Sequence, residues 1–391
     1  MKIKRLIDYN LCLGCGLCQS IYPSKCEILL DKDGFYKPVF RENLTYREDK
    51  HISELCPAIQ IRGNKHSGSW GDILYLCEGW SKDRDIRHKA ASGGVTTSLA
   101  IYLIENKIVD GILQVGVIKN NYLLNELKQS SSRDDIIQNA QSRYAPAALF
   151  KNILEILESN NKTYAFIGKP CDIAAIKNIT TKYPEYQHKI KYCISIFCAG
   201  MPSYNATIKA WRQSDYNDAP VKLKYRGDGW PGLFKAEWKD GRSFTLNYNE
   251  SWGKILGREL GLRCKMCPDG IGMLADISIG DSWSTKDGFP DFSEQEGRCF
   301  VIARTEKGKD LIKMASSDNY IEEQPLALDS IAKSQPYQAQ RRKLTLWRLI
   351  PLQIKTRFLL RFKNLNIIRL GFKADLISAF KTLIGSTRRV F

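Results

Sequence analysis

The sequence predicts an α/β fold, α+β overall when both ends of the chain are included, and three observations support this. Short apolar runs alternate with helical patterns between residues 90 and 215, as they do in proteins with a mostly parallel sheet. A cysteine-rich run near the N-terminus indicates a separate small module. Residues 341–391 mix basic and apolar side chains, which is typical of amphipathic surface helices.

The composition limits the class of protein. The chain has 391 residues, enough for two or three domains with cores of their own. Its 12 cysteines come without the apolar run of a signal peptide, which favours metal ligation in a reducing compartment over disulfides. No stretch approaches the roughly 18 apolar residues of a membrane-spanning helix. We therefore expect a cytoplasmic protein.

The N-terminal run CLGCGLC has the spacing of iron–sulfur ligands. Its cysteines are Cys12, Cys15 and Cys18. In the bacterial ferredoxin run a fourth cysteine follows and precedes a proline, but Tyr22 occupies that position here. In two-cluster ferredoxins that fourth cysteine binds the other cluster, so its loss removes a ligand from a second cluster and not from the first.

A remote cysteine completes the predicted site. Cys56 is followed by Pro57, and such a Cys-Pro pair is expected for the fourth ligand. The four cysteines therefore predict one [4Fe–4S] cluster in a ferredoxin-like module of residues 1–65. Cys26 is a competing ligand without a following proline, and half of a zinc site is the alternative interpretation.

The middle of the chain predicts a mixed α/β core of two parts, residues 66–160 and 161–340, after a polar linker at 63–70. Helices are expected from Ser92 or Gly93 and over 134–141, 146–158, 171–179 and 203–213. Strands are expected over 110–118, 163–168, 193–197, 275–280 and 299–304. Residues 221–260 alternate in polarity and turn at Asp240-Gly241, which predicts a β-hairpin insertion.

Four further cysteines form a second constellation. Cys171 and Cys198 each follow a predicted strand, while Cys264 and Cys267 form a CxxC pair. Ligands in open α/β sheets bind at the carboxyl ends of strands, so these side chains can face one point. We expect the helix that begins at Cys171 to lower its thiol pKa. The residues alone leave three alternatives: a second cluster, a zinc ion, or buried thiols without metal.

Small and hydroxyl residues at a predicted helix start suit a phosphate or the edge of a flavin. The stretch AASGGVTT supplies Ser92, Gly93, Gly94 and Thr96, although an N-capping role for Ser92 explains the pattern about as well. Arg143, in the segment SRYAP, is a candidate partner for a pyrophosphate.

Taken in order, these segments resemble the beta-subunit family of coenzyme F420 hydrogenases and dehydrogenases. The resemblance covers roughly residues 1–310. It rests on CLGCGLC with a remote CP, ASGGVTTSLA, VDGIL, SRYAP, FIGKPCDIAAI, FCAG, YRGDGWPG, RCKMCPDG and ADISIGDSW. It implies FAD and [4Fe–4S] clusters on an α/β core.

The resemblance also implies roles for individual residues. It implies that Cys171, Cys198, Cys264 and Cys267 hold a second [4Fe–4S] cluster close to the flavin. The FAD contacts that it implies are Ser92, Gly93, Gly94, Thr96, Ser142, Arg143, Tyr144, Gly168, Lys169 and Pro170. Lys169 and Asp281 are the candidates for catalytic proton handling.

A flavin and iron–sulfur clusters in one chain predict an oxidoreductase that splits a two-electron step into single-electron steps. The expected electron donor or acceptor is a ferredoxin or another acidic electron-transfer protein. The substrate is unidentified, with coenzyme F420 as one candidate, and either direction of flow is allowed. Two alternatives are an electron-transfer subunit with no substrate of its own and a zinc-binding structural or interaction protein.

The basic tail, residues 341–391, lies outside the resemblance. It holds 13 Lys or Arg and one acid, Asp375, in a chain of net charge +17. Pro351 and Gly371 are expected to divide it into two or three helical pieces. Such a segment suits an anionic membrane surface, at the inner membrane face, or an acidic partner, and a helix packed on the body is the alternative. Nucleic-acid binding is not expected because no binding motif accompanies the charge. Oligomeric state stays open.

Overall fold

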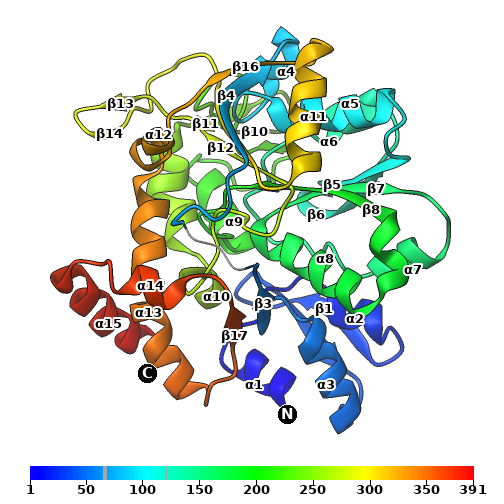
Figure 1. The fold of residues 1–391 in the computed structure, drawn as a ribbon, viewed down its shortest axis with the longest axis vertical. Helices are drawn as coiled ribbons and strands as arrows, with labels where there is room; N and C mark the ends of the chain where they lie inside the picture. The colour runs from blue at the N-terminus through cyan, green and yellow to red at the C-terminus, as the bar shows by residue number, and fades with distance from the viewer. Residues whose placement is uncertain (65–67, 120) are drawn as a thin grey trace.

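A mixed eight-stranded sheet forms the centre of the computed structural model, which describes residues 1–64, 68–119 and 121–391 (Figure 1). In spatial order the strands are β16 (Ile321–Pro325), β4 (Tyr75–Ser81), β15 (Cys299–Ala303), β12 (Ile277–Asp281), β8 (Ile190–Ile196), β7 (Tyr164–Gly168), β5 (Gly111–Ile118) and β6 (Asn121–Ser130). The α/β prediction is confirmed. Residues 65–67 of the predicted linker lie outside the described residues.

The four central strands β12, β8, β7 and β5 run parallel, and antiparallel strands flank them on both sides. Alternate residues of these strands face two separate apolar cores. One core holds the helices α5 (Val95–Glu105) and α11 (Glu306–Ser317), and the other holds α7 (Ile153–Glu158) and α8 (Pro170–Lys182). The segments that follow the parallel strands therefore share one edge of a sheet covered on both faces.

Most predicted core elements are confirmed within a few residues, including α6 (Arg133–Asn139) and α9 (Tyr204–Trp211). The helix expected over 146–158 is wrong in its first half, because only α7 is helical in that range. The carbonyl of Pro146 accepts hydrogen bonds from the Tyr204 hydroxyl at 2.7 Å and the Asn125 amide at 3.1 Å. These contacts hold the chain extended beside β6.

The N-terminal module packs against the C-terminal segment. It comprises α1 (Lys2–Asp8), α2 (Leu17–Ile21), β1 (Cys26–Leu30), β2 (Tyr36–Phe40), α3 (Tyr46–Leu55) and β3 (Gln60–Arg62). Strand β3 pairs in parallel with β17 (Arg361–Lys363), and one apolar cluster joins Ile52 and Ile59 to Leu349 and Leu360. The two ends of the chain therefore form a common core.

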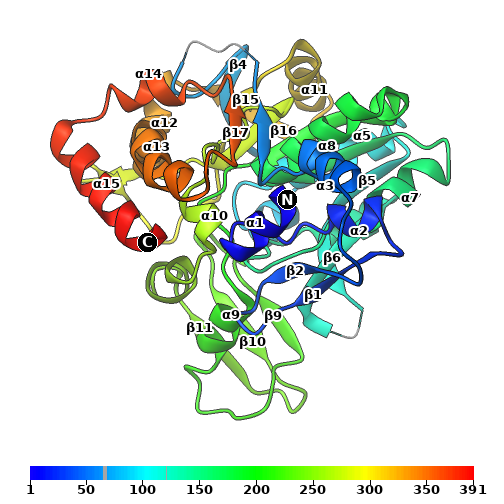
Figure 2. The same cartoon turned by 90° about the horizontal axis from the view of Figure 1, so that it is seen from below.

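The predicted hairpin insertion is confirmed as a three-stranded sheet, seen at the lower edge of Figure 2. Its strands are β9 (Lys222–Lys224), β10 (Phe234–Glu237) and β11 (Ser243–Leu246). The Trp238 amide donates to the Arg242 carbonyl at 2.9 Å across the Asp240-Gly241 turn. The remaining elements are α4 (Arg84–Lys89), a 3-10 helix (Pro184–Lys189), a π-helix (Asn249–Ile255), a 3-10 helix (Leu256–Arg258), α10 (Leu262–Lys265), β13 (Thr285–Lys286), β14 (Phe289–Pro290) and α12 (Leu328–Ser334).

The C-terminal segment contains the helices α13 (Pro336–Lys355), α14 (Ile367–Gly371) and α15 (Leu376–Val390). Gly371 ends a helix as predicted, but Pro351 lies inside α13 and does not divide it. Buried neighbours such as Leu349 and Leu352 hold the helix continuous on both sides of the proline. In the part of the chain that the structure describes, no helix is long and apolar enough to cross a membrane.

Helix α13 belongs to the body of the protein and crosses the boundary that the sequence predicts after residue 340. The buried Arg342 guanidinium donates to the carbonyls of Pro268 at 2.8 Å, Leu365 at 3.1 Å and Ser69 at 3.2 Å. One side chain thereby ties three separate segments of the chain together.

We expect Arg342→Ala to lower the free energy of unfolding by about 2–4 kcal/mol, because it leaves three carbonyls without their charged donor. Lys343→Ala removes the same charge from an exposed neighbour and should change it by less than about 0.5 kcal/mol. Chemical denaturation of both variants measures the difference. Equal effects of the two substitutions would show that Arg342 contributes charge alone.

Candidate functional site

The cysteines of the N-terminal run converge with Cys56, which directly follows α3. Cys56 acts electrostatically on Cys12, Cys15 and Cys18, so the four thiols lie close together. Burial raises the pKa of Cys12 to about 12, and an N–H···S hydrogen bond of 3.3 Å from Gly14 offsets part of that rise. We call these four residues the outer cysteine set.

Two glycines shape the loop of the outer cysteine set. Gly14 and Gly16 have φ of +64° and +89°, in the left-handed region that glycine adopts without strain. A Cβ on Gly14 would lie 2.5 Å from the Tyr36 carbonyl oxygen, and one on Gly16 would lie 2.8 Å from the Lys151 amide nitrogen. The spacing of CLGCGLC therefore depends on glycine at both positions.

Tyr22, which stands where the ferredoxin run has its fourth cysteine, joins a polar chain. Its hydroxyl lies 2.9 Å from His51 Nδ1, and His51 Nε2 lies 2.7 Å from the Tyr183 hydroxyl, just after α8. The position thus links the N-terminal module to the core. Cys26, the competing ligand considered from sequence, is buried and acts electrostatically on Cys12 and Cys18.

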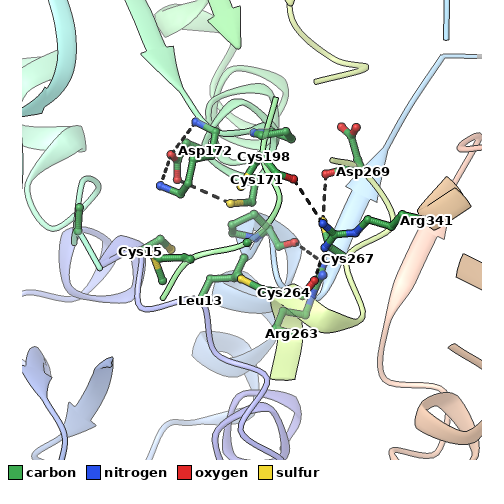
Figure 3. Close-up of a pocket in the computed structure, with 16 residues that line it drawn as sticks. Leu13, Cys15, Cys171, Asp172, Cys198, Arg263, Cys264, Cys267, Asp269 and Arg341 are labelled. Carbon is green, nitrogen blue, oxygen red and sulfur yellow. Dashed lines mark hydrogen bonds and ion pairs between the residues drawn. The ribbon is translucent and has the colours of Figure 1, made fainter. Parts of the chain in front are cut away.

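The second constellation, Cys171, Cys198, Cys264 and Cys267, lines one pocket (Figure 3). We call these four residues the inner cysteine set. Cys171 lies in the first turn of α8, Cys198 follows β8, and Cys264 lies in α10. The structure therefore brings together cysteines from three separate segments of the chain.

The environment of the inner cysteine set raises the pKa of three of its thiols, those of Cys171, Cys198 and Cys264. Burial raises the pKa of Cys198 to about 12 and also raises the pKa of Cys264. The expectation that the helix start lowers the pKa of Cys171 is wrong. Burial, followed by the nearby Asp172 carboxylate, holds that pKa well above its usual value.

Buried thiols of raised pKa remain protonated unless a bound metal displaces their protons. The thiols of the inner cysteine set are soft donors, the ligand type that iron–sulfur clusters and zinc both use. Among residues 1–64, 68–119 and 121–391, no three His, Cys, Asp or Glu side chains have the arrangement that holds a single metal ion.

The two cysteine sets adjoin each other. Leu13 and Cys15, from the outer loop, line the same pocket as the inner cysteine set (Figure 3), and so does Pro57. The buried Arg263, next to Cys264, donates to the Pro57 carbonyl at 3.4 Å and to the Ala58 carbonyl at 3.0 Å. The segments that carry Cys56 and Cys264 are therefore fixed against each other.

Helix α13 holds the loops of the inner cysteine set. The Gln338 amide donates to the Cys198 carbonyl at 2.9 Å, and Arg341 donates to the carbonyls of Ala199, at 3.1 Å, and Cys264. Figure 3 shows Arg341 beside the pocket. No sequence motif predicted this role. Both residues lie where the core meets the basic tail, and the tail was expected to act at the surface.

A cavity of about 290 Å³ lies beside the inner cysteine set, near the lower end of the volumes usual for ligand sites. Eight of the predicted FAD contacts line it: Ser92, Gly94, Thr96, Ser142, Arg143, Tyr144, Gly168 and Lys169. The other two do not line it. Gly93 is buried and donates its N–H to Cys299 Sγ at 3.2 Å, and Pro170 lines the cysteine pocket instead.

One expectation for the cavity wall is corrected, and a second residue has contacts that the sequence did not indicate. Gly94, not Ser92, is the N-cap of α5, and the Ser92 hydroxyl instead donates to the Arg298 carbonyl at 3.2 Å. The Arg143 guanidinium donates to Asn125, Tyr122 and Leu223, at 2.7, 2.8 and 3.1 Å. It thus joins β6 to β9, and its contacts favour a structural role over a contact with pyrophosphate.

The two predicted proton-handling residues both line the cavity. Lys169 also lines the cysteine pocket, and its ammonium lies 2.6 Å from Asp172. Burial alone would lower the pKa of Lys169, but the adjacent Asp172 carboxylate outweighs burial and holds it above its usual value. Lys169 is therefore a fixed cation beside the cysteine pocket and the cavity.

Asp281, the other candidate, is engaged on both carboxylate oxygens. It accepts hydrogen bonds from Arg226 at 3.0 and 3.2 Å and from the Trp230 indole at 3.1 Å. This geometry favours a role in positioning Arg226.

Comparisons with known proteins agree with this architecture. Residues 76–154 match the N-terminal family model (N-term) of the coenzyme F420 hydrogenase/dehydrogenase beta subunit. Residues 161–328 match the model of the C terminus of the same coenzyme F420 hydrogenase/dehydrogenase beta subunit. The chain belongs to the coenzyme F420 hydrogenase/dehydrogenase beta subunit family. The membership predicted from sequence motifs is confirmed.

Relatives of this family member differ in the activities for which they are named. An uncharacterized protein of Methanocaldococcus jannaschii is 24% identical over 80% of this chain and 89% of its own length. The coenzyme F420-dependent sulfite reductase of the same organism is 23% identical, over 79% of this chain but 47% of its own length. The beta subunit of F420-dependent formate dehydrogenase 1 from Methanococcus maripaludis is 29% identical, over 62% of this chain and 59% of its own length.

A solved structure has a similar fold. It is a chain of the F420-reducing [NiFe] hydrogenase complex from Methanosarcina barkeri, with a TM-score of 0.55 and 21% identity. The match covers 72% of this chain and 94% of that chain.

Sequence reasoning missed an aromatic wall of the family member's cavity. Tyr248, Trp252 and Trp283 line it together with Arg226. The Arg226 guanidinium lies 5.0 Å from the Tyr248 ring and 5.2 Å from the Trp283 ring, and Trp230 stacks on Trp283 at 4.3 Å. Arg226, Trp230 and Trp283 lie in the motifs YRGDGWPG and GDSW. The sequence therefore contained these residues in recognised motifs, but no role was predicted for them.

Asp281→Asn should lower the free energy of unfolding by about 3–5 kcal/mol, because it leaves the buried Arg226 charge without its partner. The matched control is Asp228→Asn, which breaks an exposed ion pair with Lys224 and should cost less than about 1 kcal/mol. Urea denaturation compares the two. If both variants are equally stable, Asp281 does not anchor Arg226.

Proposed function

We propose that this family member is an iron–sulfur flavoprotein oxidoreductase that relays electrons between two [4Fe–4S] clusters and FAD. The continuity of its three sites is the observation that supports the proposal. Cys15 belongs to the outer cysteine set and lines the inner pocket, while Cys198 and Lys169 line both that pocket and the large cavity. Such contiguity suits a relay, because electron transfer between redox centres weakens steeply with their separation.

The proposed roles of the residues follow from this order. One cluster would be held by Cys12, Cys15, Cys18 and Cys56, a second by Cys171, Cys198, Cys264 and Cys267, and FAD by the predicted contacts that line the cavity. When bound, each cluster supplies one-electron chemistry and the flavin supplies two-electron chemistry. Lys169 would offset negative charge and hold a proton at Nζ. Asp281 would keep Arg226 directed at the cavity.

Partners and substrate are proposed from the relatives and the charge of the chain. The relatives named for coenzyme F420 make F420 the first substrate to test. A ferredoxin or another acidic electron-transfer protein would exchange electrons at the outer cysteine set. The proposed location is the cytoplasm, with the basic C-terminal residues directed at an anionic membrane surface.

A second candidate is an electron-transfer subunit that has no substrate of its own. The names of its relatives favour it, since the formate dehydrogenase match and several hydrogenase matches are beta subunits. Purified chain that accepts electrons from reduced ferredoxin, yet reduces F420 only with a second subunit present, would establish this candidate.

The metal and flavin content of anaerobically purified protein tests the proposal. We expect about eight irons, eight sulfides and one FAD per chain, and about four irons in each of Cys18→Ser and Cys267→Ser. The control Cys77→Ala alters a buried thiol in β4 and should keep all the iron. Zinc in place of iron, without flavin, would contradict the proposal and leave a structural zinc protein.

Arg341→Gln should lower the midpoint potential of the inner cluster and leave the outer one unchanged. Loss of a positive charge beside the inner cysteine set disfavours the added electron. Lys343→Gln removes an exposed charge from the same helix and is the control. Potentiometric titration followed by electron paramagnetic resonance measures both potentials. A shift that is equal in the two variants would exclude a local role for Arg341.

A further inference from the structure

Helix α15 presents four of its large apolar side chains outward, whereas its buried residues are small. Leu376, Ile377 and Phe380 are 84%, 69% and 64% exposed. Ala379 and Ser386, on the opposite side of the helix, are buried. A surface helix of a globular protein normally has the reverse orientation, because burial of large apolar side chains drives its packing.

The outward apolar surface continues beyond α15. Of 24 exposed large apolar side chains among the described residues, nine lie within residues 354–391. They are Ile354, Phe358, Ile368, Phe372, Leu376, Ile377, Phe380, Ile384 and Phe391. Figures 1 and 2 both show α15 at the periphery of the molecule, on the side of α13 away from the N-terminal module. We call these nine residues the apolar face.

Basic side chains border the apolar face. Lys373, Lys381 and Arg388 are exposed, and helical spacing places Lys381 and Arg388 along one side of the stripe made by Leu376, Phe380 and Ile384. Residues 354–391 contain nine Lys or Arg and one acid, Asp375. Asp375 caps α15 by accepting a hydrogen bond from the Ser378 amide at 2.8 Å. The only acid within residues 354–391 is therefore engaged in capping α15, and the basic side chains there have no other acidic side chain of this segment to pair with.

We propose that the apolar face binds an anionic lipid bilayer, with α15 lying flat in the interfacial region. An outward apolar stripe bordered by Lys and Arg is the arrangement by which interfacial helices bind such surfaces. The apolar side chains enter the boundary between headgroups and acyl chains, while the basic side chains contact the lipid phosphates. Charge complementarity favours this occupant over a second copy of this chain, whose own face carries the same positive charge.

This proposal specifies the surface by which the chain would reach the membrane location given under the proposed function. It rests on the proposed function only for the reason why the chain would bind a membrane. Its test is independent of iron and flavin. Deletion from residue 341 is unsuitable, because Arg341 and Arg342 fix the inner loops. Point substitutions on the exposed side of α15 avoid that difficulty.

The test is flotation of the full-length protein with vesicles of phosphatidylcholine, alone or mixed equally with phosphatidylglycerol. We expect flotation with the mixed vesicles only, and less of it at high salt. The double variant Ile377→Ser, Phe380→Ser should float at least about tenfold less, and Lys373→Gln, Lys381→Gln should weaken binding to the mixed vesicles. The control Phe289→Ser alters a side chain that is 70% exposed in β14 and should float like the unaltered protein.

Three results would overturn the proposal. They are no flotation of the unaltered protein, flotation of the Ile377→Ser, Phe380→Ser variant equal to that of the control, and self-association that this variant abolishes while flotation persists. The last would assign the face to a second copy of the chain. Unchanged circular dichroism and metal content in every variant separate loss of binding from loss of folding, and also from failure of the redox proposal.

Discussion

The parallel order of β7, β8 and β12 is the constraint on which the candidate site depends. Because these strands run in one direction, the residues that follow or end them meet at one edge: Lys169 and Cys171 after β7, Cys198 after β8, and Asp281 at the end of β12. The inner cysteine set lies at this edge, and so does the large cavity. The CxxC pair of Cys264 and Cys267 reaches this edge from α10 and the loop that follows it.

Buried arginines provide much of that support. Arg263, Arg304 and Arg342 are each buried, and each donates to backbone carbonyls of other segments. A buried guanidinium is stable only when its donors are paired, so each arginine fixes the segments that carry its acceptors. Most of these acceptors lie in loops, including Pro57 beside Cys56 and Pro268 beside Cys267. These hydrogen bonds tie the loops of both cysteine sets to other segments of the chain.

Local pattern was sufficient for the fold class and the central strands, because strand periodicity is a property of short segments. It failed where a distant partner decides. Pro146 is extended because Tyr204 and Asn125 bind its carbonyl, and Arg143, which lines the cavity, spends its hydrogen bonds on Asn125 and Leu223. Pro351 stays helical because the flanking turns are buried. The partners of Pro146 and Arg143, and the surface that buries the turns around Pro351, come from other segments of the chain, so a local window of residues does not reveal them.

The C-terminal segment has two halves with opposite environments, although its composition is uniform. Helix α13 directs Gln338, Arg341 and Arg342 into the protein, whereas α15 directs its large apolar residues outward. Figures 1 and 2 both show α13 between α15 and the N-terminal module. A surface bound by α15 would therefore leave the outer cysteine set on the far side of α13, open to a soluble acidic partner. Membrane attachment and electron exchange would then use different faces of one rigid body.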